Sequence, residues 1–351
     1  MNGMKKTVPA LAACVVLAGG LYPPAVAGGE AAQVLPADVP PWPVGCEHAP
    51  DGRLTVRSRV MGTVFTVRAY PGPGMNEVAV EKVCKEALAC ARAWERVMSS
   101  FDAESELSVL NAAPAGKGAP VSHRLRQVLG EALRYARLTG GAFDPALGPC
   151  IRLWRKMFRR GVLPGDGELE QARKASGWEK LHLLPDGAVK TVEGMRIDLG
   201  GIGKGFAVDR MAEVLRKGGV ESFCIDSTSD VLAGQPPPGK EGWVLRVETA
   251  PGAGETLLLF GEAVSTSGME HQFVTIGGVD YSHVVNPSTG LGVTEGRQVS
   301  VAAPSAAQAD ALATAACVMP EKALRHLAAG MPGVRVLAVF LKPGPGGMAA
   351  P

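Results

Sequence analysis

The chain has 351 residues, which suits one large domain or two small ones, and its 46% hydrophobic and 20% charged content is that of an ordinary folded protein. Its 36 basic and 34 acidic residues leave a formal net charge of only +2. Because this balance lacks the basic excess of a nucleic-acid-binding surface, no nucleic-acid partner is expected.

The first 27 residues have the pattern of an export signal. Lys5 and Lys6 precede an apolar run that ends in Ala25-Val26-Ala27. The run is too short to span a bilayer as a mature helix, which needs about 20 apolar residues. We therefore expect residues 1–27 to be a signal peptide and the mature protein to be periplasmic.

The same segment contains an alternative processing site. Leu11-Ala12-Ala13-Cys14 resembles a lipobox, in which Cys14 would become the lipidated first residue of the mature chain. This form would be tethered to the inner membrane, and lipid at Cys14 is the only membrane contact expected.

None of the other cysteines forms a CxxC pair, which favours buried thiols.

The next segments predict a linker and then one folded domain. Residues 28–53 are rich in proline, glycine and alanine and should form a flexible linker before a domain at 54–341. Proline and glycine in 342–351 predict a disordered tail. Apolar periodicity predicts helices at 77–97, 122–139, 204–216, 306–317 and 322–328, and strands at 56–69, 181–184, 195–197, 223–225, 243–247, 263–265, 273–276, 298–302 and 334–341. Strands and helices mixed without regular βαβ spacing predict an α+β fold.

A glycine-rich loop lies between a predicted strand and a predicted helix. Residues 197–205 combine Asp198, four glycines and Lys204, so the backbone could approach a phosphate closely. Phe206 stands where a Walker A loop requires serine or threonine. On these residues alone, a structural turn remains an equal alternative.

Two further positions carry groups suited to chemistry. Asp310 and Thr314 are four residues apart in a predicted helix, which places a carboxylate and a hydroxyl on one face as oxygen ligands for a hard cation such as Mg²⁺. His283 follows a predicted strand and could accept a proton from an attacking hydroxyl. A solvated polar stripe and a structural histidine are the alternatives at these positions.

Taken in order, these segments resemble the FAD:protein FMN transferase family, formerly called thiamine biosynthesis lipoproteins of the ApbE type. The resemblance covers about residues 57–341 and depends on the order of the motifs. They are Met61-Gly62-Thr63, Ser100-Phe101, Ser105-Glu106-Leu107-Ser108 with Asn111, residues 139–145, the loop at 198–205, Thr266-Ser267-Gly268, residues 283–290 and residues 309–314.

The resemblance implies a single α+β domain that holds FAD in a cleft with its pyrophosphate beside Mg²⁺. By motif position, Asp310 and Thr314 resemble side-chain ligands of the metal, and Gly201 resembles the residue that offers a backbone carbonyl. Positions similar to the family's flavin and nucleotide contacts are Met61, Phe101, Ala142, Phe143, Asp144, Asp198, Lys204 and Val284.

The resemblance also implies the reaction. A threonine or serine hydroxyl of an acceptor protein would attack the phosphorus of the FMN half of FAD, and AMP would leave. His283 is the residue expected to act as the general base. The acceptor would carry a flavinylation motif, like those of respiratory or periplasmic electron-transfer proteins.

The chain departs from the family pattern at residues 226–230. The sequence Asp226-Ser227-Thr228-Ser229-Asp230 stands where a Gly-Gly-Asp turn is usual, and only glycine adopts φ > 0 without cost. Either the loop has moved or its contacts have changed. Asn286 and Ser288 are milder differences, at positions where aspartate and arginine are common.

Two other functions are compatible with the same residues. Water could replace the acceptor hydroxyl, which would make the protein an FAD pyrophosphatase that releases FMN and AMP. Alternatively, an exported flavin-binding protein could keep the cleft without the chemistry.

Overall fold

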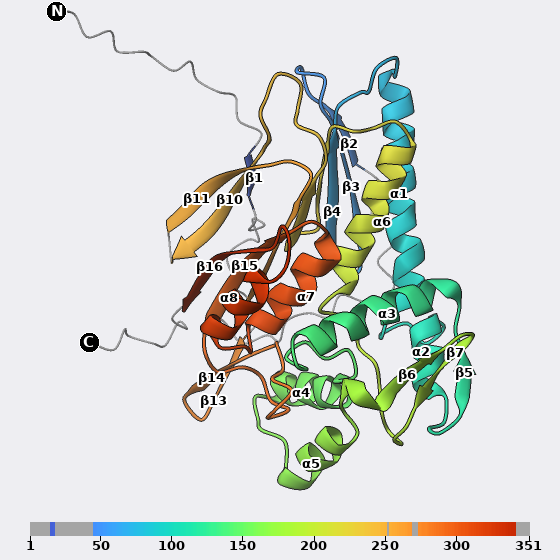
Figure 1. Cartoon of the computed structure of the whole chain (residues 1–351), viewed down its shortest axis with the longest axis vertical. Helices are drawn as coiled ribbons and strands as arrows, with labels where there is room; N and C mark the ends of the chain where they lie inside the picture. The colour runs from blue at the N-terminus through green and yellow to red at the C-terminus, as the bar shows by residue number, and fades with distance from the viewer. Residues whose placement is uncertain (1–14, 18–44, 251–252, 269–272, 342–351) are drawn as a thin grey trace, which may run out of the picture.

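The computed structural model describes residues 15–17, 45–250, 253–268 and 273–341, and it confirms the predicted α+β fold (Figure 1). Its centre is an eight-stranded sheet in which neighbouring strands are antiparallel. In spatial order the strands are β16 (Arg335–Leu341), β15 (Arg297–Ala303), β12 (Ala263–Gly268), β9 (Asp230–Ala233), β8 (Phe223–Asp226), β4 (Thr63–Ala69), β3 (Leu54–Val60) and β2 (Gly45–His48).

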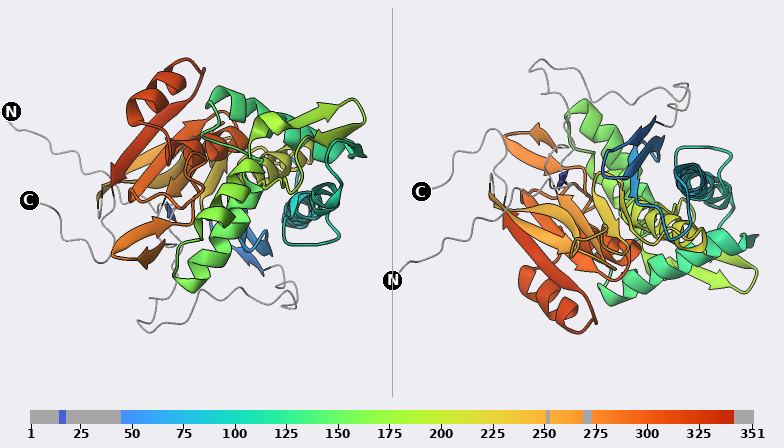
Figure 2. Two further views of the ribbon diagram at one scale, coloured as in Figure 1. Left: turned by 90° about the horizontal axis from the view of Figure 1, so that it is seen from below. Right: turned by 90° about the horizontal axis from the view of Figure 1, so that it is seen from above.

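Helices cover one face of this sheet, and a second, smaller sheet covers part of the other face. In β8, Phe223 and Ile225 belong to the core on the helical side, whereas Cys224 belongs to the core on the opposite side, as the two-residue period of a strand requires. Seen along the sheet, α1 and α6 lie together on one side (Figure 2). The helical layer consists of α1 (Glu77–Met98), α6 (Gly203–Lys217) and α7 (Ala306–Ala316). The smaller sheet consists of β10 (Trp243–Ala250), β11 (Ala253–Leu259) and β1 (Val15–Leu17).

The remaining elements flank these layers. They include a three-stranded sheet and a two-stranded hairpin, both separate from the large sheet. These elements are α2 (Glu106–Ala112), β5 (Gly118–Pro120), α3 (His123–Leu138), α4 (Gly148–Arg160), α5 (Asp166–Lys174), a 3₁₀ turn at Trp178–Lys180, β6 (Leu181–Leu184), β7 (Gly187–Lys190), β13 (Phe273–Ile276), β14 (Val279–Ser282) and α8 (Glu321–Ala329).

The single strand predicted at 56–69 is wrong, because this segment forms most of a hairpin. β3 and β4 pair up to Val60 opposite Thr63, which leaves a two-residue turn. In this turn φ is 52° at Met61 and 74° at Gly62. Positive φ at both central residues is typical of a type I′ turn, which suits the twist of a hairpin. The alternation of apolar residues continues through the turn, so it did not reveal the reversal.

The strand predicted at 195–197 is also wrong. The Asn111 side chain takes the place of a neighbouring strand, because its Nδ2 donates to the Ile197 carbonyl at 2.9 Å and its Oδ1 accepts from the Ile197 amide at 2.6 Å. The segment is therefore extended, and its backbone groups are satisfied by a side chain instead of a β ladder.

The regular structure begins before the predicted domain boundary. Residues 45–48, expected within the linker 28–53, form β2 and pair with β3, so the sheet starts at Gly45 and not at Leu54. Cys14, most of the predicted signal peptide and linker, and the tail at 342–351 lie outside the described residues. Export and lipidation therefore stay predictions. Val15–Leu17, also within that predicted signal, form β1.

Two further findings concern the described residues as a whole. Four of their six cysteines are buried, two are half-buried, and all six are free thiols. Among the described helices, none has both the length and the apolar character needed to cross a membrane.

Candidate functional site

The junction of α6 and α7 is closely packed because a glycine lies at the contact. A Cβ on Gly205 would lie 2.2 Å from the carbonyl oxygen of Ala306 and 2.8 Å from the Cβ of Asp310. Because the two helices lie this close, the Gly205 amide donates a hydrogen bond to Asp310 Oδ2 at 3.1 Å. Asp209 of α6 accepts hydrogen bonds from the amides of Ala306 at 2.7 Å and Ala307 at 2.9 Å, which fixes the first turn of α7.

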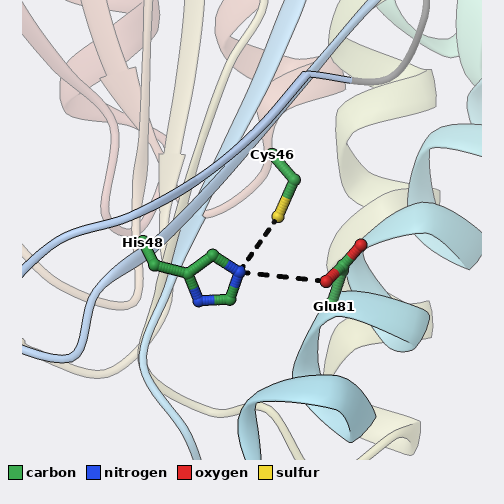
Figure 3. A group of neighbouring side chains, drawn as sticks. All are labelled: Cys46, His48 and Glu81. Atoms are coloured by element: carbon green, nitrogen blue, oxygen red, sulfur yellow. Dashed lines mark hydrogen bonds and ion pairs between the residues drawn. The ribbon is translucent and has the colours of Figure 1, made fainter.

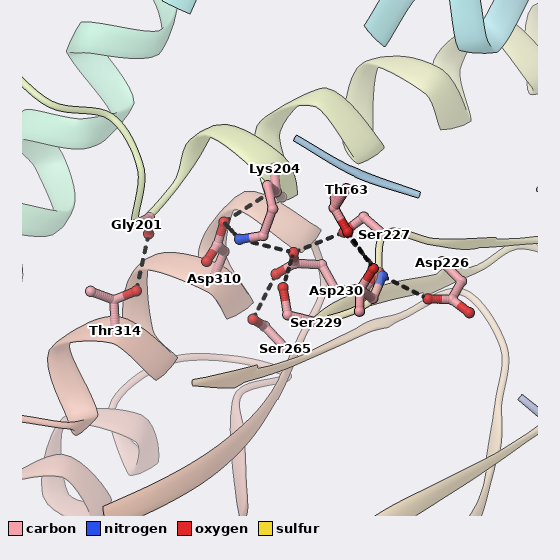
Figure 4. Close-up of polar contacts among 12 residues, drawn as sticks. Thr63, Gly201, Lys204, Asp226, Ser227, Ser229, Asp230, Ser265, Asp310 and Thr314 are labelled. Carbon is pink, nitrogen blue, oxygen red and sulfur yellow. Dashed lines mark hydrogen bonds and ion pairs between the residues drawn. The ribbon is translucent and has the colours of Figure 1, made fainter. Parts of the chain in front are cut away.

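Lys204 lies between two buried carboxylates at this junction (Figure 4). Its Nζ is 3.4 Å from Asp230 Oδ2 and 3.7 Å from Asp310 Oδ2. Burial alone would lower the pKa of Lys204, but the two carboxylates outweigh burial and raise it. Burial, and then the charge of Asp230, raise the pKa of Asp310 to about 7. When all three groups are ionised, the cluster keeps one negative charge, which favours a further cation.

Three serine hydroxyls surround the buried carboxylate of Asp230. Ser227 and Ser229 donate to its Oδ2 at 2.9 Å and 2.8 Å, and Ser265 of β12 donates to its Oδ1 at 2.7 Å. Two of these hydroxyls come from the segment in which the sequence departs from the family's glycines. The changed segment therefore supplies hydrogen-bond donors to the carboxylate that pairs with Lys204.

The turn before Asp230 requires only one residue with positive φ. Among the residues from Ser227 to Ser229 this is Thr228, at 81°. Its hydroxyl lies 2.6 Å from that of Thr63, and its amide donates to Asp226 Oδ1 at 2.9 Å. Contacts with the β3–β4 hairpin therefore hold a backbone conformation that is unfavourable for threonine.

The predicted metal ligands gather where the loop before α6 meets α7. Thr314 Oγ1 lies 3.4 Å from the Gly201 carbonyl oxygen, and Asp310 precedes Thr314 by one turn on the same face (Figure 4). A Cβ on Gly201 would lie 2.9 Å from Thr314 Cγ2 and 3.2 Å from Phe143 Cε2, so a side chain there would displace Thr314. A carboxylate, a hydroxyl and a carbonyl are the oxygen donors that Mg²⁺ accepts, and these residues therefore fit the metal.

Asp198 connects the glycine-rich loop to an exposed aromatic ring. Its Oδ2 accepts from Arg155 Nη1 at 3.0 Å and from Ser100 Oγ at 3.3 Å, and its Oδ1 accepts from the Gly200 amide at 2.9 Å. The guanidinium of Arg155 lies 4.9 Å from the centre of the Phe101 ring. Phe101 is 80% exposed, so part of this ring is free to stack on a planar ligand.

The remaining predicted contacts have mainly structural partners in the free protein. Asp144 accepts the amide hydrogens of Ala146 at 2.7 Å and Trp178 at 3.2 Å, and burial raises its pKa to about 6. Ala142, half-buried, lies in the turn just before it. At the tip of the β3–β4 hairpin, the Met61 amide donates to a carboxylate of α1 at 2.9 Å.

His283 and Val284 lie directly after β14. His283 is exposed and Val284 is half-buried. The Val284 amide donates to Ser282 Oγ at 3.1 Å, and Trp154 Nε1 of α4 donates to the Ser282 carbonyl at 2.9 Å. The bond from Trp154 anchors the turn on α4, the helix that also carries Arg155.

Three residues of this arrangement were not identified from the sequence. They are Asp230, Ser265 and Arg155, which complete the Lys204 cluster and the contacts of Asp198. A signal existed for Asp230, since it ends the segment that replaces the family's Gly-Gly-Asp turn. Ser265 and Arg155 carry no local signal, because their partners are distant in the sequence.

Comparison with known proteins identifies the family of this chain. The model of the ApbE family matches residues 61–338. The FAD:protein FMN transferase of Treponema pallidum is 32% identical over 82% of this chain and 86% of its own length. The protein of the same name from Vibrio cholerae is 31% identical over 79% of this chain and 84% of its own length.

Solved structures extend the likeness to the fold. The flavin transferase ApbE of Vibrio cholerae superposes with a TM-score of 0.73 and 26% identity, covering 85% of this chain and 97% of that protein. An ApbE protein from Thermotoga maritima gives a TM-score of 0.72 with 27% identity, over 82% of this chain and 94% of that one. The resemblance predicted from the ordered motifs is confirmed, and the chain belongs to the ApbE family.

Proposed function

We propose that this protein is an FAD:protein FMN transferase that requires Mg²⁺, joins FMN to a threonine or serine of an acceptor protein and releases AMP. The enzyme class follows from the family and from relatives of that name. The observation that carries the finer proposal is the cluster at the α6–α7 junction, where a carboxylate, a hydroxyl and a backbone carbonyl lie beside the ion pairs of Lys204.

The residues that would hold Mg²⁺ are Asp310, Thr314 and Gly201, the last through its carbonyl oxygen. When bound, the ion supplies positive charge that neutralises the pyrophosphate of FAD. The charge of Lys204 favours the ionised form of Asp310 and so opposes the effect of burial on the pKa of this carboxyl.

The flavin and nucleotide would lie against the loop before α6 and the turns around it. The exposed ring of Phe101 offers a flat apolar face, and Arg155 beside it offers a positive charge. We assign the remaining contacts of FAD to Met61, Ala142, Phe143, Asp144, Asp198, Lys204 and Val284, as the motif positions imply.

In the reaction, the acceptor hydroxyl oxygen forms a bond to the phosphorus of the FMN half. The bond from that phosphorus to the bridging oxygen breaks, and its electron pair leaves with AMP. His283 takes the proton of the attacking hydroxyl. Exposure of His283 supports this role, since the base must meet a side chain that belongs to another protein.

The experiment is incubation of the purified protein with FAD, Mg²⁺ and a protein that bears a flavinylation motif, followed by denaturing electrophoresis under ultraviolet light and assay of AMP. We expect a fluorescent acceptor band. Asp310→Asn, which keeps the size of the side chain, should lower transfer by at least about 10²-fold. His283→Ala should lower it by about 10²- to 10⁴-fold while FAD still binds. Asp186→Asn, in an exposed turn, is the matched control and should leave transfer unchanged.

Other results would select a different function. Metal-dependent AMP and FMN without a labelled acceptor would indicate an FAD pyrophosphatase or an acceptor that does not match the enzyme. FAD binding without AMP would show a flavin-binding protein. Full activity of Asp310→Asn would overturn the assigned metal site.

We also propose that the protein is exported and meets its acceptor in the periplasm, because residues 1–27 carry the export pattern. Mass spectrometry of the mature N-terminus tests this. A terminus at Gly28 is expected for a periplasmic form, and lipid on Cys14 for a tethered one. An intact Met1 in protein recovered from its native cell would contradict export.

A further inference from the structure

A second group of metal-ligating side chains lies at the edge of the large sheet, where β2 faces the start of α1 (Figure 3). Cys46 and His48 are two residues apart on β2, so both side chains point to the same face of the sheet. Glu77 and Glu81 are four residues apart on α1, so their carboxylates lie on the same side of the helix. The strand therefore presents a thiol and an imidazole to the helix, and the helix presents two carboxylates to the strand.

The distances in this group suit a single small cation. His48 Nε2 lies 3.5 Å from Cys46 Sγ and 3.9 Å from Glu81 Oε2, and the three ligand atoms all lie within 4.8 Å of one another. Bonds of about 2.3 Å to sulfur and about 2.0 Å to nitrogen or oxygen in a tetrahedral site separate the ligand atoms by roughly 3.3–3.6 Å. The separation of His48 and Cys46 already matches these values, whereas Glu81 would have to move closer to the other two ligand atoms by roughly 0.5–1 Å.

The hydrogen-bond partners leave the required atoms available. His48 Nδ1 lies 3.0 Å from Glu77 Oε2, which assigns the ring proton to Nδ1 and directs the Nε2 lone pair toward Cys46 and Glu81. A carboxylate on the far nitrogen of a ligating histidine is a recurrent feature of zinc sites. Lys85 pairs with Oε1 of Glu81 at 2.6 Å, whereas the oxygen that faces His48 is Oε2.

We propose that Cys46, His48 and Glu81 form a binding site for Zn²⁺ or a similar borderline divalent cation, with Glu77 as the residue that orients His48. The fourth position would be taken by water, as in zinc sites with three protein ligands. Sulfur and nitrogen donors distinguish this site from the oxygen donors around Asp310, which suit Mg²⁺. The bound ion would join the edge strand β2 to α1, so its effect would be on the stability of this edge.

The test is a titration of the purified, reduced protein with Co²⁺, followed by displacement with Zn²⁺. We expect one equivalent of Co²⁺ to produce thiolate-to-cobalt charge-transfer absorption and the visible bands of a four-coordinate ion, and Zn²⁺ to remove both. Cys46→Ser should abolish the charge-transfer band and weaken Zn²⁺ binding by at least about 10²-fold, and Glu77→Gln should weaken it by about 10-fold. Matched controls are Cys90→Ser and Glu86→Gln, both on α1 and outside the group, which should bind as the unchanged protein does.

Two further measurements keep the proposal falsifiable. Zn²⁺ should raise the midpoint of thermal unfolding of the unchanged protein and of Cys90→Ser, but not of His48→Ala. Circular dichroism without metal should be the same for all variants, because the group is at the surface. Absence of the charge-transfer band in the unchanged protein, or its survival in Cys46→Ser, would overturn the site. Flavin transfer with Mg²⁺ should persist in Cys46→Ser, so failure of this inference is distinct from failure of the proposed function.

Discussion

Two sets of ionisable side chains, the Lys204 cluster and the metal-ligand group around Cys46, differ in the elements that carry them and in how deeply they are buried. Lys204, Asp230 and Asp310 come from three elements that meet in the interior, and both carboxylates are buried. Cys46, His48 and Glu81 come from one edge strand and one helix and lie at or near the surface. The difference teaches that loss of one member of the interior cluster leaves buried polar groups without partners, whereas the edge group can change at little cost to folding.

The sharpest test of this difference is the loss of one carboxylate from each group. Asp230→Ala leaves Lys204 with one partner and three serine hydroxyls without their acceptor, so we expect a loss of about 3–5 kcal/mol in the free energy of unfolding. Glu81→Ala, without added metal, removes only ion pairs near the surface, with Lys85 and His48, and should cost less than about 1 kcal/mol. Urea denaturation of both variants measures the two losses, and equal losses would remove the distinction.

The pH dependence of stability should also separate buried from surface carboxylates. Burial raises the pKa of Asp209 to about 6 in the folded protein, above the value of about 4 for an unfolded aspartate. The folded state therefore holds this proton more tightly, and the stability linked to it is fully present below pH of about 4 and lost as pH rises to about 6, by roughly 2–3 kcal/mol. Asp209→Asn should remove this part of the decline when urea denaturation is followed from acid to neutral pH. An unchanged slope in the variant would contradict the assignment.

A methyl group tests whether the close contact of α6 and α7 is required. In Gly205→Ala the new Cβ would meet the Ala306 carbonyl, so the helices must separate, at a cost of about 1–3 kcal/mol and with loss of FMN transfer. Gly167→Ala in α5 is the matched control, because nothing lies within 4 Å of its added Cβ. This control should be neutral or more stable by up to about 1 kcal/mol. Thermal unfolding of the pair measures the contrast, and a stable, active Gly205→Ala would show that the contact is loose.

The smallest expected effect concerns the segment that replaces the family's glycines. Thr228→Gly removes the strain of a positive φ, because glycine has no Cβ, but it also loses the contact with Thr63. The stability of this variant should therefore stay within about 0.5–1 kcal/mol of the unchanged protein. Ser229→Gly removes a donor to Asp230 without relieving strain and should cost about 1 kcal/mol or more. Urea denaturation orders the two variants. If Ser229→Gly is the more stable variant, the hydrogen bond from Ser229 does not stabilise the carboxylate of Asp230.

Much of the fold was predictable because long elements carry strong periodicity. The helix expected at 77–97 is α1, and those expected at 204–216 and 306–317 are α6 and α7, each within a residue or two at the ends. Three helices were missed. α2 and α5 are only seven and nine residues long, which leaves few turns for a clear pattern, but the length of α4, 13 residues, does not explain why it was missed.

The sequence by itself determined the chemistry that was available. The glycines of residues 200–205, the spacing of Asp310 and Thr314, and the order of the motifs all lie in local stretches, and they were sufficient to indicate the family and a cation site. The edge group has local spacing too, two residues on a strand and four on a helix, but its two halves are about 30 residues apart.

Only the tertiary structure decided which charges meet. Asp230 lies 26 residues after Lys204 and 80 before Asp310, and no local rule predicts that they share a buried site. The physical reason is that a buried charge is stable only when the surrounding elements bring it partners, and those partners depend on how the sheet orders β9 and β12 beneath α6 and α7.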